Sequence, residues 1–304
     1  MKFSLNEDQS DLLTGLEGLI ASEAPPMPVE PRAYEVAEGL ERALAEAGYL
    51  DLAWEPTYGL LGAALVIERL ARLPQAMECA ASALVAPGLG LEPGRRPLAL
   101  ASRADAPARF MPTASLLAIA GADEARLFEV DPASVQPVET LFAYPYGRAS
   151  ADGLTLVGTV DSGMLLRRWR IALATEAAGC MAAAIGAIVE HVSTRQAFGR
   201  PLGAFQAIQH RLAMAAASAE GVKWLAFRAA WCDGDADAAL AAGLAQARIA
   251  TLTYDLHQFS GAMGLTLEFP LHYWTYRLRA LAGELGGASR QARDAAALTW
   301  IDAA

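Results

Sequence analysis

The chain has 304 residues, of which 54% are hydrophobic and 19% are charged, so it can bury a sizeable core in more than one domain. Its formal net charge is −10, without the basic surplus that nucleic-acid-binding proteins carry, and we therefore exclude nucleic acid as a partner. Its three cysteines are far apart in the sequence and form no CxxC pair, which favours reduced thiols and a cytoplasmic location.

The first part of the chain is predicted to be helical. Ser4 and Glu7 have the spacing of a capping box, and apolar residues at helical spacing follow them. A second helix is expected from about 32 to 47, and a third and a fourth between 61 and 85. We assign residues 1–95 to an N-terminal helical domain.

The middle of the chain changes character after residue 87, where glycines and prolines break the helical pattern. Short apolar runs separated by turn residues then indicate strands. These runs are 98–101, 116–120, 125–130 and 154–160. We predict a small β domain over residues 96–162.

The remaining residues, 163–304, are predicted to form a helical bundle joined by short turns. The expected helices are long and rich in alanine, and they span 165–194, 203–232, 236–260, 270–285 and 288–302. The most apolar run, around 171–189, contains Glu176 and many small residues, which favours a buried helix over a membrane span. The predicted fold class is therefore mainly α with a small β domain.

The turn between the first two of these helices, residues 193–210, contains more arginine, phenylalanine and glutamine than a simple connector needs. Arg195 could bind a phosphate, and Phe198 offers a flat face for a planar ligand. The alternative is a tight turn in which the arginine caps helix carbonyls.

A second unusual stretch, residues 254–272, is rich in glycine at the end of a predicted helix. Small residues allow a backbone to approach a phosphate closely, although a simple helix C-cap uses the same residues. The four histidines have no metal-ligand spacing, and we predict no metal site.

Both stretches resemble signatures of the acyl-CoA dehydrogenases, flavoproteins that desaturate acyl-CoA thioesters. The first resembles the family's R-x-x-F-G segment with its downstream Gln, and the second resembles its Q-x-x-G-G-x-G segment. The resemblance implies an FAD cofactor, and in the family the second segment approaches the flavin pyrophosphate of a neighbouring subunit. The cofactor-binding residues that it implies are Arg195, Phe198, Gln206, Gln258, Gly261 and Ala262.

The sequence departs from this family in two places. The middle domain is short and lacks the segment that contacts the flavin ring and the substrate. The family's catalytic base would fall at Leu285, so the candidate base is Glu284, one position earlier, and a surface glutamate is the alternative. Arg170 matches a family arginine beside the catalytic carboxylate, while the family's other base position is Trp169 here.

The resemblance implies an acyl-CoA dehydrogenase-like fold with a reduced middle domain, as in shortened subunits of bacterial heteromeric enzymes. We expect one subunit of a heterotetramer that shares an FAD site with a second dehydrogenase-like chain. Its substrate would be an acyl-CoA, such as a bulky or sterol-side-chain thioester, and its electron acceptor an electron-transfer flavoprotein. The alternatives are a homomeric enzyme that uses Glu284 as base, and a non-catalytic scaffold with the same fold.

Overall fold

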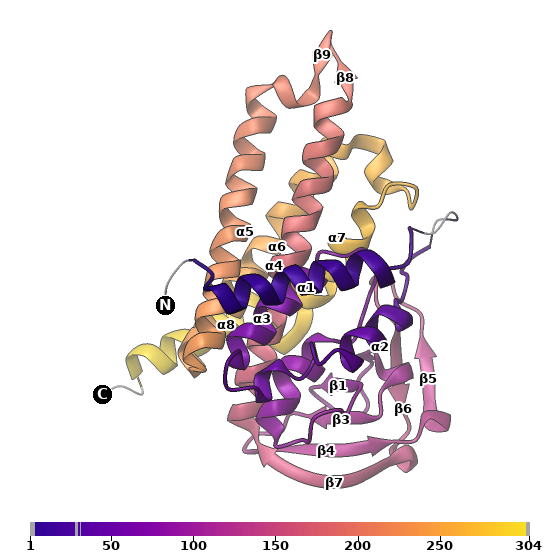
Figure 1. Cartoon of the computed structure of the whole chain (residues 1–304), viewed down its shortest axis with the longest axis vertical. Coiled ribbons are helices and arrows are strands. Elements are labelled where there is room, and N and C mark those ends of the chain that lie inside the picture. The colour runs from indigo at the N-terminus through magenta and orange to yellow at the C-terminus, as the bar shows by residue number, and fades with distance from the viewer. Residues whose placement is uncertain (1–3, 28–29, 31, 302–304) are drawn as a thin grey trace.

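The computed structural model describes residues 4–27, 30 and 32–301, and it combines a tall helical bundle with a small β region at one end (Figure 1). The α-helices are α1 (Glu7–Glu23), α2 (Glu38–Glu46), α3 (Gly59–Leu70), α4 (Ser162–Thr194), α5 (Gln206–Cys232), α6 (Asp235–Ser260), α7 (Leu271–Gly283) and α8 (Gly287–Ala296). The predicted fold class, mainly α with a small β region, is therefore confirmed. The predicted domain boundaries remain predictions, and residues 1–3 and 302–304 at their outer ends lie outside the described residues.

The N-terminal helices differ from the predicted ones at their ends. The predicted capping box at Ser4 and Glu7 is wrong, because Asn6 caps α1 and forms the box with Gln9. The helix predicted from 32 begins only at Glu38. The helix predicted after α3 is instead a short π-helical turn, Ala81–Val85, followed by a 3-10 turn, Ala86–Leu89.

The β region consists of two small sheets that face each other across a common apolar core. The first sheet has the order β1-β3-β4-β7 and the second the order β2-β6-β5. Their strands are β1 (Leu98–Ala101), β2 (Ala108–Arg109), β3 (Leu116–Ile119), β4 (Glu124–Val130), β5 (Val135–Val138), β6 (Tyr146–Ala149) and β7 (Leu154–Asp161). All four predicted strands are present, and β1 and β3 pair in parallel while the other neighbours are antiparallel.

Helix α4 is the central element of the molecule, since it contacts α3, α5, α6 and α7. Its small residues allow neighbouring backbones to come close, and a Cβ atom on Gly179 would lie 2.2 Å from the carbonyl oxygen of Glu68 on α3. Among the described residues, α4 is the helix long and apolar enough to cross a membrane, but 78% of its most apolar window is buried inside the protein. This burial agrees with the prediction of a core helix.

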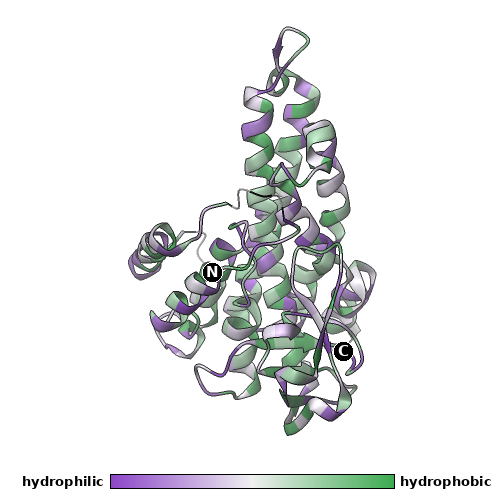
Figure 2. Cartoon of the chain, turned by 90° about the vertical axis from the view of Figure 1, so that its right-hand side faces the viewer, coloured by the Kyte–Doolittle hydropathy of each residue, from purple (hydrophilic) through white to green (hydrophobic). Residues whose placement is uncertain are grey.

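The bundle has two ends because α4, α5, α6 and α7 run alternately up and down. The upper end carries the hairpin of β8 (Gln196–Ala197) and β9 (Arg200–Pro201) and the 3-10 turn Gly261–Leu265 (Figure 1). The lower end packs against the β region. Figure 2 shows hydrophobic residues along the bundle helices up to this hairpin. Large hydrophobic side chains that are exposed on the bundle include Met214, Trp231, Leu240 and Tyr254.

Candidate functional site

The sequence-predicted site residues lie at opposite ends of the bundle. Arg170 is near the start of α4 and Arg195 follows its last residue, 195 − 170 = 25 positions later. At 1.5 Å of rise per residue, these two positions are about 37 Å apart along the helix axis. The structure therefore brings the predicted residues together as two groups, which we call the tip and the cleft.

The first segment of the tip is the connection between α4 and α5. Arg195 is exposed, and its side chain has no ion-pair partner among the residues that the structure describes. Phe198 turns the hairpin with a positive φ of 53° and is 91% exposed, with the ring of Phe205 at 6.1 Å. Gln206, the first residue of α5, is exposed as well. The predicted phosphate-binding and ring-stacking side chains are thus accessible to a ligand from outside.

The second segment of the tip follows α6. Gln258 is exposed on the last turn, and the chain reverses at Gly261, whose φ is 60° and whose missing Cβ would face open space. The positive φ falls on this glycine and not on Ala262, so an alanine is tolerated at the second position. His191 of α4 packs on Phe269 at 5.2 Å, which joins this segment to the first one.

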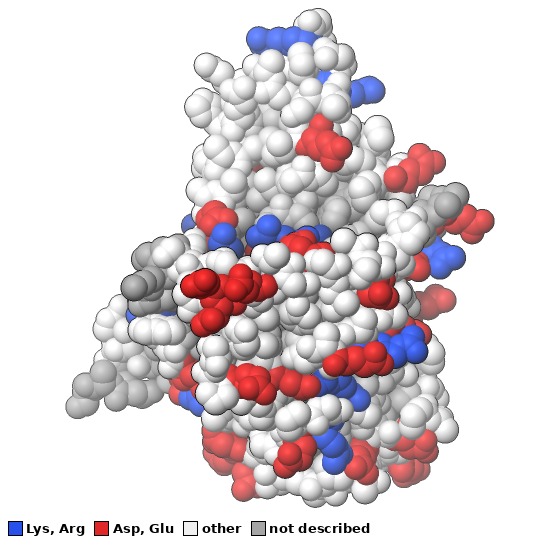
Figure 3. Space-filling view, in the orientation of Figure 1, with Lys and Arg blue, Asp and Glu red and all other residues white. Residues whose placement is uncertain are grey.

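Charge is distributed unevenly between the two ends. On the face shown in Figure 3, Lys and Arg side chains stand at the tip, most of the upper bundle is uncharged, and most Asp and Glu side chains lie over the lower half, with further Lys and Arg among them. Large apolar side chains are also exposed at the tip, at Met263 (47%) and Leu265 (76%) as well as Phe198. An accessible surface with unpaired arginine and exposed apolar side chains can take a planar anion or a partner protein.

The cleft lies between the β region and the turn from α7 to α8, and it has a volume of about 520 Å³. Arg170 lines it and is fixed by α8, since its Nε donates to Oε1 of Gln291 at 2.6 Å and its guanidinium pairs with Asp294. Burial lowers the pKa of Arg170, and the charge of Asp294 opposes that effect. Its partners are therefore residues of α8, and Glu284 is not one of them.

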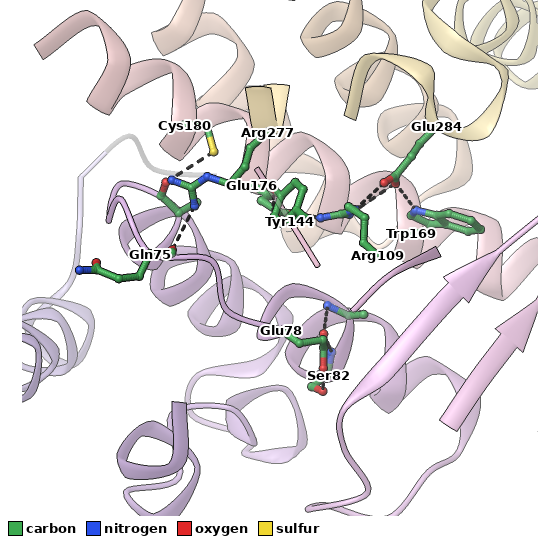
Figure 4. A network of polar contacts seen from close by, with 12 residues as sticks. Gln75, Glu78, Ser82, Arg109, Tyr144, Trp169, Glu176, Cys180, Arg277 and Glu284 are labelled. Atoms are coloured by element: carbon green, nitrogen blue, oxygen red, sulfur yellow. Dashed lines mark hydrogen bonds and ion pairs between the residues drawn. The ribbon is translucent and has the colours of Figure 1, made fainter. Parts of the chain in front are cut away.

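Glu284 also lines the cleft, and the alternative of a surface glutamate is wrong because its side chain is only 16% exposed. Helix α7 ends at Gly283, and Leu285 has a positive φ of 53°, so helical spacing no longer sets the direction of the Glu284 side chain. Its carboxylate turns inward, where it accepts hydrogen bonds from Nε of Arg109 at 2.6 Å and from Nε1 of Trp169 at 2.7 Å (Figure 4).

Arg109 is the residue of this cleft that sequence reasoning missed. Besides Glu284, its guanidinium pairs with Glu176 of α4 at 3.0 Å and lies 4.6 Å from the ring centroid of Tyr144, whose hydroxyl donates to Glu176. Burial by itself would lower the pKa of Arg109, but the two carboxylates raise it well above its usual value. The available signal was Glu176, because a carboxylate in an apolar helix needs a buried partner.

No group of three or more His, Cys, Asp or Glu side chains in the described part of the chain could hold a metal ion. His257 and Thr275 lie within hydrogen-bond distance at 3.1 Å, and His272 contacts the backbone oxygens of Phe269 and Arg32. Two of the four histidines therefore belong to the packing of α6 and α7.

Residues 159–298 match the family model described as "Acyl-CoA dehydrogenase, C-terminal domain". The acyl-CoA dehydrogenase FadE34 of Mycobacterium tuberculosis is 34% identical over 134 residues, which are 42% of this chain and 19% of that protein. A bovine (Bos taurus) mitochondrial short-chain specific acyl-CoA dehydrogenase is 34% identical over 127 residues, 40% of this chain and 29% of that protein. The matched part thus spans less than a third of either relative.

Solved structures match almost the whole chain. A variant of the steroid ACAD Tcur3481-Tcur3483 has a TM-score of 0.80 at 21% identity, over 99% of both chains. The ChsE4-ChsE5 complex of Mycobacterium tuberculosis has a TM-score of 0.73 at 20% identity, over 96% of this chain and 97% of that one. An FAD complex of PigA has a TM-score of 0.71 at 16% identity, over 97% and 98%. Residues 159–298 therefore form an acyl-CoA dehydrogenase C-terminal domain, and the chain as a whole has the acyl-CoA dehydrogenase fold.

Proposed function

We propose that this chain is one subunit of a heteromeric, FAD-dependent acyl-CoA dehydrogenase, and that its tip contributes to a flavin site shared with a partner subunit. The observation that carries the shared site is the separation of the tip from the cleft, and the pairing of Glu284 with Arg109 and Trp169 favours a second kind of chain over a second copy. Arg195 lies about 37 Å along the α4 axis from Arg170 of the cleft, and Gln258 is exposed on the last turn of α6, so neither can serve a cofactor held in the chain's own cleft. A flavin that contacts them must lie mainly on another chain.

The residues of the tip fit the cofactor that they are proposed to hold. Arg195 has a guanidinium free for a pyrophosphate, and Gly261 leaves space for a phosphate to approach the backbone. Phe198 and Gln206 offer an aromatic face and an amide in the same connection. Bound FAD would supply the hydride acceptor for α,β-desaturation of an acyl-CoA thioester, while this chain's residues bind and orient it.

The partner is proposed to be a second acyl-CoA dehydrogenase-like chain in a heterotetramer. Support comes from the paired names of two structural neighbours, the steroid ACAD Tcur3481-Tcur3483 and the ChsE4-ChsE5 complex. The first of these names also supports a bulky CoA thioester, such as a sterol-side-chain thioester, as substrate. The cytoplasmic location and an electron-transfer flavoprotein as electron acceptor remain expectations of the proposal.

A homomeric enzyme that uses Glu284 is the second candidate, because that carboxylate does lie in the cleft. Two features weigh against it. Both oxygens of Glu284 already accept hydrogen bonds from Arg109 or Trp169, and the middle domain lacks the family's segment for the flavin ring.

The visible absorption spectrum of the purified protein tests the proposal. We expect no flavin band for the chain expressed alone, and a flavin band with turnover of an acyl-CoA when it is co-expressed with a second dehydrogenase-like chain. Stoichiometric FAD and turnover by the chain alone would favour the homomeric enzyme. No flavin in either preparation would favour the scaffold.

A further inference from the structure

Three cavities follow one another from the cleft into the N-terminal helical region. The outer one is the cleft of about 520 Å³, and the two inner ones measure about 30 and 20 Å³. The first two share the side chains of Arg109, Trp169 and Glu284 in their walls, while the two inner ones share that of Glu176. Each inner cavity has room for about one or two water molecules, so neither can hold an acyl chain.

The side chains between these cavities form a single bonded group, which we call the latch: Arg109, Tyr144, Trp169, Glu176 and Glu284 (Figure 4). Arg109 comes from β2, Glu176 from α4 and Glu284 from the turn after α7, so the latch ties the β region to two parts of the bundle. The side chains of the three ionic members are 14%, 7% and 16% exposed.

The latch is hard to open because its charges are shielded from water. Moving Arg109 aside would leave Glu176 and Glu284 buried and uncompensated, and a buried charge without its partner is strongly unfavourable. Tyr144 and Trp169 donate further hydrogen bonds to the two carboxylates and add to the cost of displacing either one. An apolar acyl chain could not replace any of these interactions.

We infer that Arg109 closes the way from this chain's own cleft into its inner cavities to acyl chains, and that Glu284 is the anchor of Arg109 and not a catalytic base. The inference rests on the proposed function and deepens it, because it assigns the chemistry of the complex to the partner's cleft. In this chain Arg109 and Glu284 are positioning residues: they hold the β region against the bundle that carries the tip.

Chemical labelling of native thiols tests the closure without any flavin. Cys79 lines the innermost cavity, whereas Cys180 is buried on α4 and lines none of the three cavities, so it serves as the control. In a Cys232→Ser background, which removes the exposed thiol, an alkyl methanethiosulfonate should label both buried thiols slowly. Combining Arg109→Met, Glu176→Gln and Glu284→Gln should accelerate Cys79 by about tenfold or more, as for a local opening, and change Cys180, one helical turn after Glu176, much less.

Fast labelling of Cys79 in the chain with an intact latch, or no acceleration in the triple variant, would overturn the closure. If the triple variant does not fold, Cys79 and Cys180 will both react fast. The same labelling of the single variant Glu284→Gln then tests the closure in its place. In the flavin-containing complex, kcat should stay within about twofold for Glu284→Gln, whereas loss of a general base lowers it about 100-fold or more. A complex without flavin would contradict the shared site alone, because the labelling result stands independently of it.

Discussion

The tip and the cleft use similar residues in opposite ways. Each has arginine, aromatic and polar side chains, but Arg195 and Phe198 at the tip are exposed, while Arg109 and Glu284 in the cleft are paired and largely buried. A side chain that already has its partners stabilises the fold, and one that has none is available to a ligand. In this chain the residues best placed for binding are therefore far from the cavity that looks most like an active site.

The largest expected effect on stability is in the cleft. Arg109→Ala should lower the free energy of unfolding by about 3–5 kcal/mol, because it leaves two carboxylates buried without their common cation. Urea unfolding would measure this loss. Arg103→Ala is the matched control, since the Arg103 side chain is 71% exposed and its ion pair with Asp105 is screened by water and should contribute little. Equal losses of unfolding free energy in the two variants would show that the ion pairs of Arg109 stabilise the protein no more than a surface ion pair does.

At the tip the expected effect is on binding instead. Arg195→Ala should weaken FAD binding by the co-expressed complex about 10- to 100-fold, the range for a lost hydrogen bond to a charged group. The free energy of unfolding should change by less than about 0.5 kcal/mol, since the side chain is exposed. Flavin fluorescence titration measures the affinity, with Arg228→Ala as an exposed control far from the tip. An unchanged affinity would mean that the tip is only a turn.

Two neighbouring acids in the N-terminal part of the chain, Glu41 and Glu78, make the stability of the protein depend on pH. Burial, together with the nearby carboxylate of Glu78, raises the pKa of Glu41 to about 8. A raised carboxyl pKa means that stability is lost as the pH rises from the unfolded value near 4.5 through about 8.

Glu41→Gln should therefore raise the free energy of unfolding by about 1–3 kcal/mol at pH 9, and by much less at pH 4. Thermal unfolding at the two pH values would measure the difference. The neighbouring exposed Glu38→Gln is the control, and a pH-independent effect of the Glu41 variant would contradict the assignment.

An equally small effect on stability, with a smaller effect on flavin binding than for Arg195→Ala, is expected for Phe198→Ala. Its ring is 91% exposed, so unfolding should change by less than about 0.5 kcal/mol. The loss of one stacking face should still weaken flavin binding several-fold. A large loss of stability would instead show that the ring supports the hairpin. Phe198 would then stabilise the fold, as the paired residues of the cleft do.

Much of the fold could be predicted because helical periodicity and turn residues are local signals. The four predicted strands and the bundle helices are present, with ends shifted by a few residues. Strands β2, β5 and β6 were missed, since β2 has only two residues and β5 contains Pro137. The fourth helix predicted before residue 85 was wrong, because Ala81–Val85 forms only a short π-helical turn and its apolar residues suit an α-helix equally well.

The tip could be identified from its motif, but its distance from the cleft could not, because that distance follows from the length of α4 in three dimensions. The latch is harder still. Arg109 and Glu284 are 175 positions apart in the sequence, and no local pattern indicates that they pair. The direction of the Glu284 side chain depends on the positive φ of Leu285, a conformation that a leucine seldom adopts and that sequence reasoning therefore does not anticipate.

The most direct test of the account is an experimental structure of the complex, purified after co-expression with the partner and saturated with FAD. We expect flavin density in the partner's cleft, with the pyrophosphate within hydrogen-bond distance of Arg195 and Gln258 of this chain, and Arg109 still paired with Glu176 and Glu284. Flavin seated in this chain's own cleft beside a displaced Arg109, with the tip far from any cofactor, would contradict it.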